Sequence, residues 1–364
     1  MQLRFQPYAL HFIHPFGVSG NTRTSTISVF VEIGDGDVKG YGEACLPPYL
    51  GETEAATVAF LHAARPLIHS ASSGANFTEL LLRIDQLQQG CNAAKAALDM
   101  ALNDLAAKQK GVPLRRYKAL PEVASKPTSF TIGIDTEEVV VQKIKASADF
   151  QILKIKAGTG HDKELISLIR KHTNQPLYVD VNQGWTNKHM ALEMMQWMAD
   201  KNVVLVEQPM PKEQLADMRW LTQHSPLPTF ADESVKRLSD LEQLDGAFNG
   251  INIKLMKCTG VNEALKMIQY CRNHHLQVFL GCMAESTCGT SAMAQLMGLA
   301  DYIDLDAPQL YKNDPFTGLA YAHGKIHLGQ GAGTGATPLP GLFGNLWKKA
   351  YIKDKPPFSW FLLN

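Results

Sequence analysis

The chain has 364 residues, and its 35 basic side chains balance its 35 acidic ones, so the formal net charge is zero. This balance argues against the strongly basic surface that binds nucleic acids or anionic membranes, and it favours a small-molecule partner. Because a single core seldom grows beyond about 250–300 residues, the length predicts one barrel-sized domain and a smaller module.

The N-terminal segment has no charged stretch followed by a continuous apolar run, and no window approaches about 18 uninterrupted apolar residues. We therefore expect neither secretion nor a membrane span. The six cysteines lack CxxC spacing, which is typical of reduced thiols rather than of disulfides or structural zinc. These features predict a cytoplasmic protein with no membrane or nucleic-acid partner.

The first part of the chain predicts an α+β capping domain over residues 1–115. Alternating apolar and polar residues indicate three strands, at 3–12, 25–33 and 39–47. Helical periodicity follows at 54–68, and residues 91–109 predict a strongly amphipathic helix. Strands followed by helices are typical of an α+β module.

From about residue 128, short apolar strands alternate with amphipathic helices. Eight strand-like segments occur: SFTIGI, QILKIKA, PLYVDVN, VVLVEQP, PTFADES, GINIKLM, QVFLGCM and YIDLDAP. Nearly continuous apolar strands are what a parallel sheet buried on both faces requires. The expected fold is therefore α/β: a modified TIM barrel, (β/α)7β, over 116–325. We expect a Gly-rich tail at 326–364 to return to the capping domain and complete it.

Charged residues stand at the ends of five successive predicted strands. Lys156, Asp180, Glu207, Asp232 and Lys254 follow one another at intervals of 24, 27, 25 and 22 residues. Each interval has room for one strand, one helix and two loops, which is the period of a (β/α) barrel. Because the strand ends of a barrel meet at its C-terminal mouth, the five side chains should share one pocket.

The three acids, Asp180, Glu207 and Asp232, are each a polar exception beside apolar strand residues. Burying such charges unpaired costs several kcal/mol, so they need a cation. Their hard oxygen ligands suit Mg²⁺, one per subunit, and suit Zn²⁺ poorly because no histidine or cysteine joins them. A lysine beside other cations can have a lowered pKa, which would make it available as a base.

This arrangement resembles the enolase superfamily in its muconate-lactonizing-enzyme branch. The resemblance covers essentially the full chain and rests on the KxK motif of Lys154 and Lys156, the three acids, and Lys254 in NIKLMK. It implies Mg²⁺-assisted removal of a proton α to a carboxylate, with Lys156 and Lys254 as the catalytic bases. Lys154 is then a substrate contact.

The second and sixth strands, which carry Lys156 and Lys254, lie on opposite sides of a barrel axis. Bases on both faces of one carbon permit removal of a proton from one face and its return to the other, which inverts the stereocentre. Asp304 and Asp306 share a face of the eighth strand and are suited to hold an ammonium group. This DxD pair resembles the motif with which dipeptide epimerases hold the substrate N-terminus, so the resemblance implies epimerisation of the second residue of an Ala-Xaa dipeptide.

The nature of Xaa depends on residues 17–25, which we expect to form a lid loop with glycine hinges. Relatives that act on Ala-Glu carry an arginine for the substrate's side-chain carboxylate five residues beyond a Pro-Phe pair. Here that position is Asn21, and Arg23 lies two residues further on. We therefore expect Xaa to be small or apolar rather than strictly Glu. Met283 and Glu285, after the seventh strand, are further candidate substrate contacts.

Other interpretations remain at this point. A single acid at a strand end more often caps a helix, although five in succession favour an active site. Elimination or cycloisomerisation, as in o-succinylbenzoate synthases and lactonizing enzymes, is disfavoured because those substrates have no ammonium for Asp304 and Asp306. A Schiff-base aldolase would leave the three acids without a purpose, and a non-catalytic barrel would not need both lysines. We also expect a homo-oligomer, because barrels of this size often associate.

Overall fold

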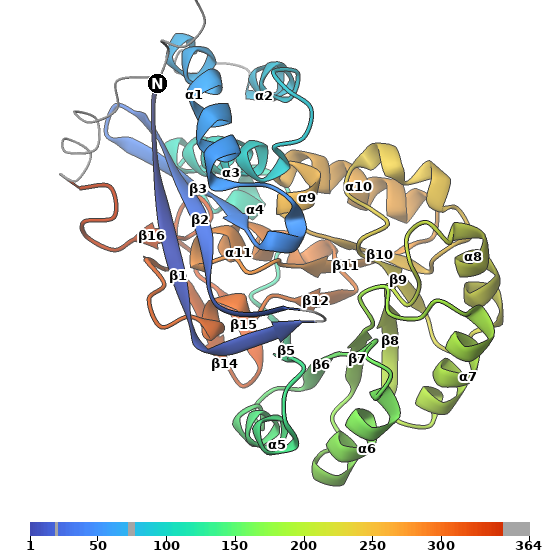
Figure 1. Cartoon of the computed structure of the whole chain (residues 1–364). Helices are drawn as coiled ribbons and strands as arrows, with labels where there is room; N and C mark the ends of the chain where they lie inside the picture. The colour runs from blue at the N-terminus through green and yellow to red at the C-terminus, as the bar shows by residue number, and fades with distance from the viewer. Residues whose placement is uncertain (19–20, 72–76, 345–364) are drawn as a thin grey trace, which may run out of the picture.

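The structure is a computed structural model that describes residues 1–18, 21–71 and 77–344. Its N-terminal module contains an antiparallel sheet of three strands, β1 (Gln2–Val18), β2 (Asn21–Asp35) and β3 (Val38–Leu46). A 3-10 turn, η1 (Pro48–Leu50), and four helices follow: α1 (Glu54–Ser70), α2 (Phe77–Asp85), α3 (Asn92–Gln109) and α4 (Leu114–Tyr117). The helices gather beside the sheet above the barrel (Figure 1).

Eight parallel strands then follow in chain order around a near-barrel, which confirms the predicted fold class. They are β5 (Ser129–Ile132), β6 (Ile152–Lys156), β7 (Leu177–Asp180), β8 (Val203–Glu207), β9 (Thr229–Ala231), β10 (Gly250–Ile253), β11 (Gln277–Gly281) and β12 (Tyr302–Asp304). The last strand lies beside the first, because Ser129 Oγ donates a hydrogen bond to Asp304 and the Thr131 amide donates one to Asp306.

The connecting helices surround the strands on the outside (Figure 1). They are α5 (Glu137–Ala146), α6 (Asp162–His172), α7 (Lys188–Ala199), α8 (Leu215–His224), α9 (Leu255–Cys258), α10 (Val261–Asn273) and α11 (Thr287–Ala294), with the 3-10 turn η4 (Met297–Leu299) before β12. The prediction of a helix between Asp232 and Lys254 is wrong. Two 3-10 turns stand there, η2 (Leu238–Asp240) and η3 (Glu242–Leu244). This interval is the shortest of the four, and the Asp240 carboxylate closes a tight turn on two backbone amides.

Helix α3 joins the two modules and is buried on all sides, so its predicted amphipathic character is wrong. Every residue from Ala93 to Ala107 is buried. The helix contacts β3 and also α9 and α10 of the barrel. Its polar side chains have partners from distant parts of the chain. Asp99, for example, accepts a hydrogen bond of 2.6 Å from the Val261 amide at the start of α10.

The chain beyond β12 contacts both modules. After η5 (Ala307–Leu310) come β13 (Phe316–Thr317), β14 (Leu319–Ala322), β15 (Lys325–Leu328) and β16 (Thr337–Pro338), and β15 pairs with β4 (Ser125–Pro127). In the Gly-rich tail, the Thr334 amide donates a hydrogen bond of 2.7 Å to Asp104 of α3. The tail therefore reaches the capping module, while residues 345–364 lie outside the described part of the chain.

The segment expected as a lid loop at 17–25 is largely the paired end of a β-hairpin. Backbone pairing between β1 and β2 extends to Val18 and Asn21, and residues 19 and 20 are outside the described part. Earlier in β1, Phe12 forms an isolated β-bridge with Tyr311, which follows η5. The hairpin is thereby attached to the end of the barrel that carries the strand C-termini.

All six cysteines are free. Among the described residues, no helix combines the length and the apolar character that crossing a bilayer requires.

The close approach of β3 to α3 gives a test of this packing. A methyl group at Gly42 would lie 2.0 Å from the Ala97 carbonyl oxygen, so Gly42→Ala must push sheet and helix apart. We expect it to lower the free energy of unfolding by roughly 2 kcal/mol or more, measured by urea denaturation. Gly34→Ala is the matched control, because nothing lies within 4 Å of its added methyl. Equal effects of the two substitutions would contradict the packing described.

Candidate active site

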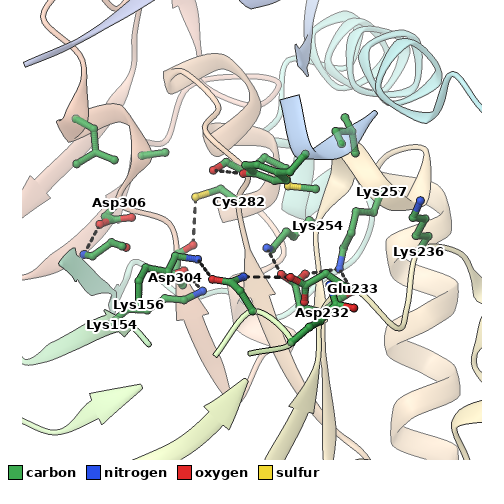
Figure 2. A pocket seen from close by; sticks show the side chains of 18 of the residues that line it. Lys154, Lys156, Asp232, Glu233, Lys236, Lys254, Lys257, Cys282, Asp304 and Asp306 are labelled. Carbon is green, nitrogen blue, oxygen red and sulfur yellow. Dashed lines mark hydrogen bonds and ion pairs between the residues drawn. The ribbon is translucent and has the colours of Figure 1, made fainter. Parts of the chain in front are cut away.

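A cavity of about 390 Å³ opens at the C-terminal ends of the barrel strands, which is where barrel enzymes carry their active sites. Its volume is within the range of small-molecule sites. Seven residues proposed from the sequence line it: Lys154, Lys156, Asp232, Lys254, Met283, Asp304 and Asp306. Figure 2 shows Lys154, Lys156 and Asp304 on one side, with Asp232, Lys254 and Lys257 across from them.

The three acids converge at the base of this cavity, where Asp232 forms part of the wall. Asp180 and Glu207 end β7 and β8 and are fully buried, and Asp232 directly follows β9 with 5% exposure. One oxygen of each lies within 4.8 Å of the others. Lys154 bridges two of them and Asp304, because its Nζ lies 2.7 Å from Glu207 Oε2, 3.2 Å from Asp180 Oδ2 and 2.9 Å from Asp304 Oδ2.

The two proposed bases approach from opposite sides of the strand ring. Lys156 ends β6, and its Nζ lies 2.7 Å from Asp180 Oδ2. Lys254 directly follows β10, and its Nζ lies 2.7 Å from Asp232 Oδ2. These are the second and sixth strands of the eight, so three strands lie between them in either direction around the ring.

The acids and lysines shift one another's pKa values. Burial raises the pKa of Glu207, and the nearby charge of Asp180 raises it further. Burial also works against the charged form of Lys254, but attraction to Asp232 and Glu207 outweighs it and raises the pKa of this lysine. For Lys254, the surrounding side chains therefore do not produce the lowered pKa expected from the sequence.

The donor set fits a hard divalent cation. All three groups are carboxylates, and no histidine or cysteine belongs to the cluster among the described residues. Buried Glu207 Oε2 accepts no hydrogen bond from the described chain, although Lys154 lies beside it as an ion pair. A cation bound to these oxygens would offset the carboxylate charge that raises the pKa of Lys254.

The two aspartates of the DxD pair have different surroundings. Both oxygens of Asp304 are engaged, Oδ1 by Ser129 Oγ at 2.6 Å and Oδ2 by Lys154 at 2.9 Å. Asp306 accepts a hydrogen bond of 2.7 Å from the Thr131 amide, and burial, with the charge of Asp304, raises its pKa to about 7. Asp306 is therefore the member with more capacity to bind a cationic group.

The remaining candidate substrate contacts, Asn21, Arg23 and Glu285, are not among the described residues that line the cavity. The side chain of Asn21 is outside the described part. Arg23 is buried, and its guanidinium lies over the rings of Phe12 and Tyr49, of which Tyr49 lines the cavity. The structure does not place Glu285 in the cavity wall. Its carboxylate is buried and accepts a hydrogen bond of 2.6 Å from the Met283 amide.

Several lining residues were not proposed from the sequence. Lys257 lies one helical turn after Lys254, and Glu233 follows Asp232, so their spacing offered a signal. Tyr49 and Leu50 come from the capping module, and no local pattern predicts that contact.

Comparison with known proteins identifies the family of this chain. Residues 6–117 match the mandelate racemase / muconate lactonizing enzyme N-terminal domain, and residues 137–341 match the enolase C-terminal domain-like family. The fold and the site are those of a barrel enzyme with an acidic centre at its mouth. The chain belongs to the mandelate racemase / muconate lactonizing enzyme family of the enolase superfamily.

The similarity to individual relatives extends over most of the chain. An L-Ala-D/L-Glu epimerase from Bacteroides thetaiotaomicron is 46% identical, with 92% of this chain and 87% of that protein covered. The substrate-liganded L-Ala-D/L-Glu epimerase of Bacillus subtilis has a TM-score of 0.88 at 28% identity, covering 93% of this chain and 98% of that one. A dipeptide epimerase of Enterococcus faecalis complexed with Mg and L-Leu-L-Tyr has a TM-score of 0.84 at 31% identity, with coverages of 92% and 99%.

Removal of one acid tests the metal centre without any substrate. We expect saturating Mg²⁺ to raise the melting temperature of the protein, since a ligand at 100 times its dissociation constant adds about 2.7 kcal/mol of stability. Glu207→Gln should lose this shift in differential scanning calorimetry, because a neutral amide replaces a ligand charge. Asp301→Asn, which changes a partly exposed acid paired with Arg272, should keep it. An undiminished shift in Glu207→Gln would contradict the assignment.

Proposed function

We propose that the protein is a Mg²⁺-dependent dipeptide epimerase, an isomerase that inverts the α-carbon of the second residue of an Ala-Xaa dipeptide. The observation that carries this proposal is the placement of Lys156 and Lys254 on opposite sides of one cavity. The three acids converge at its base, and Asp306 lies two residues beyond the end of the eighth strand.

The residues divide the chemistry between them. Asp180, Glu207 and Asp232 would hold Mg²⁺, which supplies positive charge for the substrate carboxylate and for the negative charge that develops when the α-proton leaves. One lysine, as a neutral amine, accepts the α-proton from its face of the carbon. The other, as an ammonium, donates a proton to the opposite face, and the roles exchange in the reverse direction.

The remaining polar groups position the dipeptide. Asp306 accepts the substrate ammonium by a charge-assisted hydrogen bond, while Asp304 keeps Lys154 in place. Lys154, between Asp304 and the acid cluster, neutralises charge and contacts the substrate carboxylate. The names of the relatives support this assignment, since they include L-Ala-D/L-Glu epimerase and, for an Enterococcus faecalis protein of 34% identity, hydrophobic dipeptide epimerase.

We propose that Xaa is small or apolar rather than strictly Glu. The cavity wall supports this, because it includes Tyr49, Leu50, Met283 and Leu310. Arg23 does not line the cavity but stacks against Tyr49, and Asn21 and Arg23 stay predictions as substrate contacts. We further propose a cytoplasmic location, which the free cysteines support. The homo-oligomer stays a prediction, for which sedimentation analysis is the test.

A panel of dipeptides tests the proposed function. We expect the Mg²⁺-loaded protein to interconvert L-Ala-L-Xaa and L-Ala-D-Xaa, followed by chiral chromatography, with apolar Xaa at least as fast as Glu. N-acetyl-L-Ala-L-Xaa is the control, because acetylation converts the ammonium that Asp306 binds into a neutral amide and leaves the reacting α-carbon unchanged. Its kcat/KM should fall about 10- to 150-fold, the equivalent of a charged hydrogen bond of roughly 1.5–3 kcal/mol.

Two outcomes of this panel would contradict the proposal. Turnover of Ala-Glu alone would exclude the small or apolar preference. Equal turnover of acetylated and free dipeptides would exclude Asp306 as the ammonium site and shift the assignment to another reaction of the superfamily.

A further inference from the structure

Two buried side chains that take no part in the proposed proton transfer each donate a hydrogen bond to one oxygen of a metal-ligand candidate. Asn252 Nδ2 donates a hydrogen bond of 2.7 Å to Glu207 Oε1, and Lys257 Nζ donates one of 2.6 Å to Asp232 Oδ1. In each carboxylate the other oxygen, Oε2 or Oδ2, lies 2.7 Å from a lysine Nζ of the cavity. Each acid therefore has one oxygen bonded to Asn252 or Lys257 and the other beside Lys154 or Lys254.

Both donors are fixed in place. The Lys257 ammonium has three hydrogens and three acceptors: Asp232 Oδ1, the Asp232 carbonyl at 2.7 Å and the Asn252 carbonyl at 3.1 Å. The Asn252 amide packs against Gly281, where an added methyl would lie 2.4 Å from its oxygen. Neither donor can turn away without giving up buried hydrogen bonds.

The third acid follows the same arrangement. Asp180 Oδ1 accepts a hydrogen bond of 3.1 Å from the backbone N–H of Asn182, and Asp180 Oδ2 faces Lys156. A carboxylate with one oxygen held in this way offers a single oxygen to a metal. Mg²⁺ takes six oxygens at about 2.0–2.1 Å in a near-octahedral shell, whereas Ca²⁺ takes about six to eight at roughly 2.3–2.6 Å and accepts both oxygens of a carboxylate.

We propose that Asn252 and Lys257 are positioning residues that set the choice of cation. By keeping Glu207 and Asp232 as one-oxygen ligands, they favour a small octahedral ion over a larger ion that binds carboxylates through two oxygens. The inference takes the metal from the proposed function, but it concerns binding of the ion alone. It can therefore be tested in the absence of any dipeptide.

The test is isothermal titration calorimetry of the metal-depleted full-length protein with Mg²⁺ and with Ca²⁺. Asn252→Ala removes the donor to Glu207 without changing charge, and Lys257→Met removes the donor to Asp232 while keeping the length of the side chain. We expect the ratio of Ca²⁺ affinity to Mg²⁺ affinity to rise about tenfold or more in each, the size of effect that groups supporting a metal ligand commonly have.

Lys254→Met is the matched control for charge. Lys254 and Lys257 are similarly buried and contact the same carboxylate, but on different oxygens. Loss of a positive charge acts alike on two divalent ions, so Lys254→Met should leave the affinity ratio unchanged. A ratio that also stays unchanged in Asn252→Ala and Lys257→Met would overturn the inference, and so would an equal rise in Lys254→Met.

Two further outcomes bear on the same inference. If Lys257→Met does not fold, Asn252→Ala decides alone, because it perturbs no charge. A wild-type protein that binds Ca²⁺ more tightly than Mg²⁺ would also overturn the inference. Failure of the epimerase assignment is recognised separately, as Mg²⁺ binding with normal selectivity in a protein that turns over no dipeptide.

Discussion

The burial of three carboxylates within 4.8 Å of one another is the constraint on which the rest of the site depends. Like charges this close and this far from water are tolerated only when cations and hydrogen-bond donors compensate them. The neighbouring strands supply both. Lys154 bridges two of the acids, Lys156 and Lys254 each contact one, and Asn252 and Lys257 satisfy the outer oxygens. The two lysines proposed as bases are thus held in place by two of the acids proposed as metal ligands.

The capping module completes this site from one side. Buried Glu43 of β3 accepts hydrogen bonds from the amides of Ser286 and Gly289, where α11 begins, and from Ser28 in β2. This bond set fixes the capping sheet to the segment that follows the seventh barrel strand. Tyr49 is then carried to the cavity wall, with its hydroxyl 3.4 Å from the Met283 carbonyl. The cavity wall therefore contains residues of both modules.

The charged strand ends could be predicted from the sequence because barrel geometry is periodic. A regular interval and a polar exception in an apolar strand suffice to bring Lys156, Asp180 and Glu207 to one mouth. The burial of α3 could not be predicted, since its acids look like a solvated face until their partners are known. Asp99 and Asp104 bond to Val261 and Thr334, which are distant in sequence. The wall formed by Tyr49, and the burial of Glu285 away from it, depend likewise on how the two modules dock.

The central claim is that two lysines act on opposite faces of one α-carbon, and the first turnovers in D₂O test it most directly. Proton NMR of the Mg²⁺-loaded protein with L-Ala-L-Xaa would measure deuterium at the α-carbon as loss of the α-proton signal, in the product diastereomer and in recovered substrate. Two bases predict that the product carries deuterium from the start while recovered substrate initially keeps its proton. Early transfer of the substrate's own proton into the product would show one base serving both faces and would contradict the account.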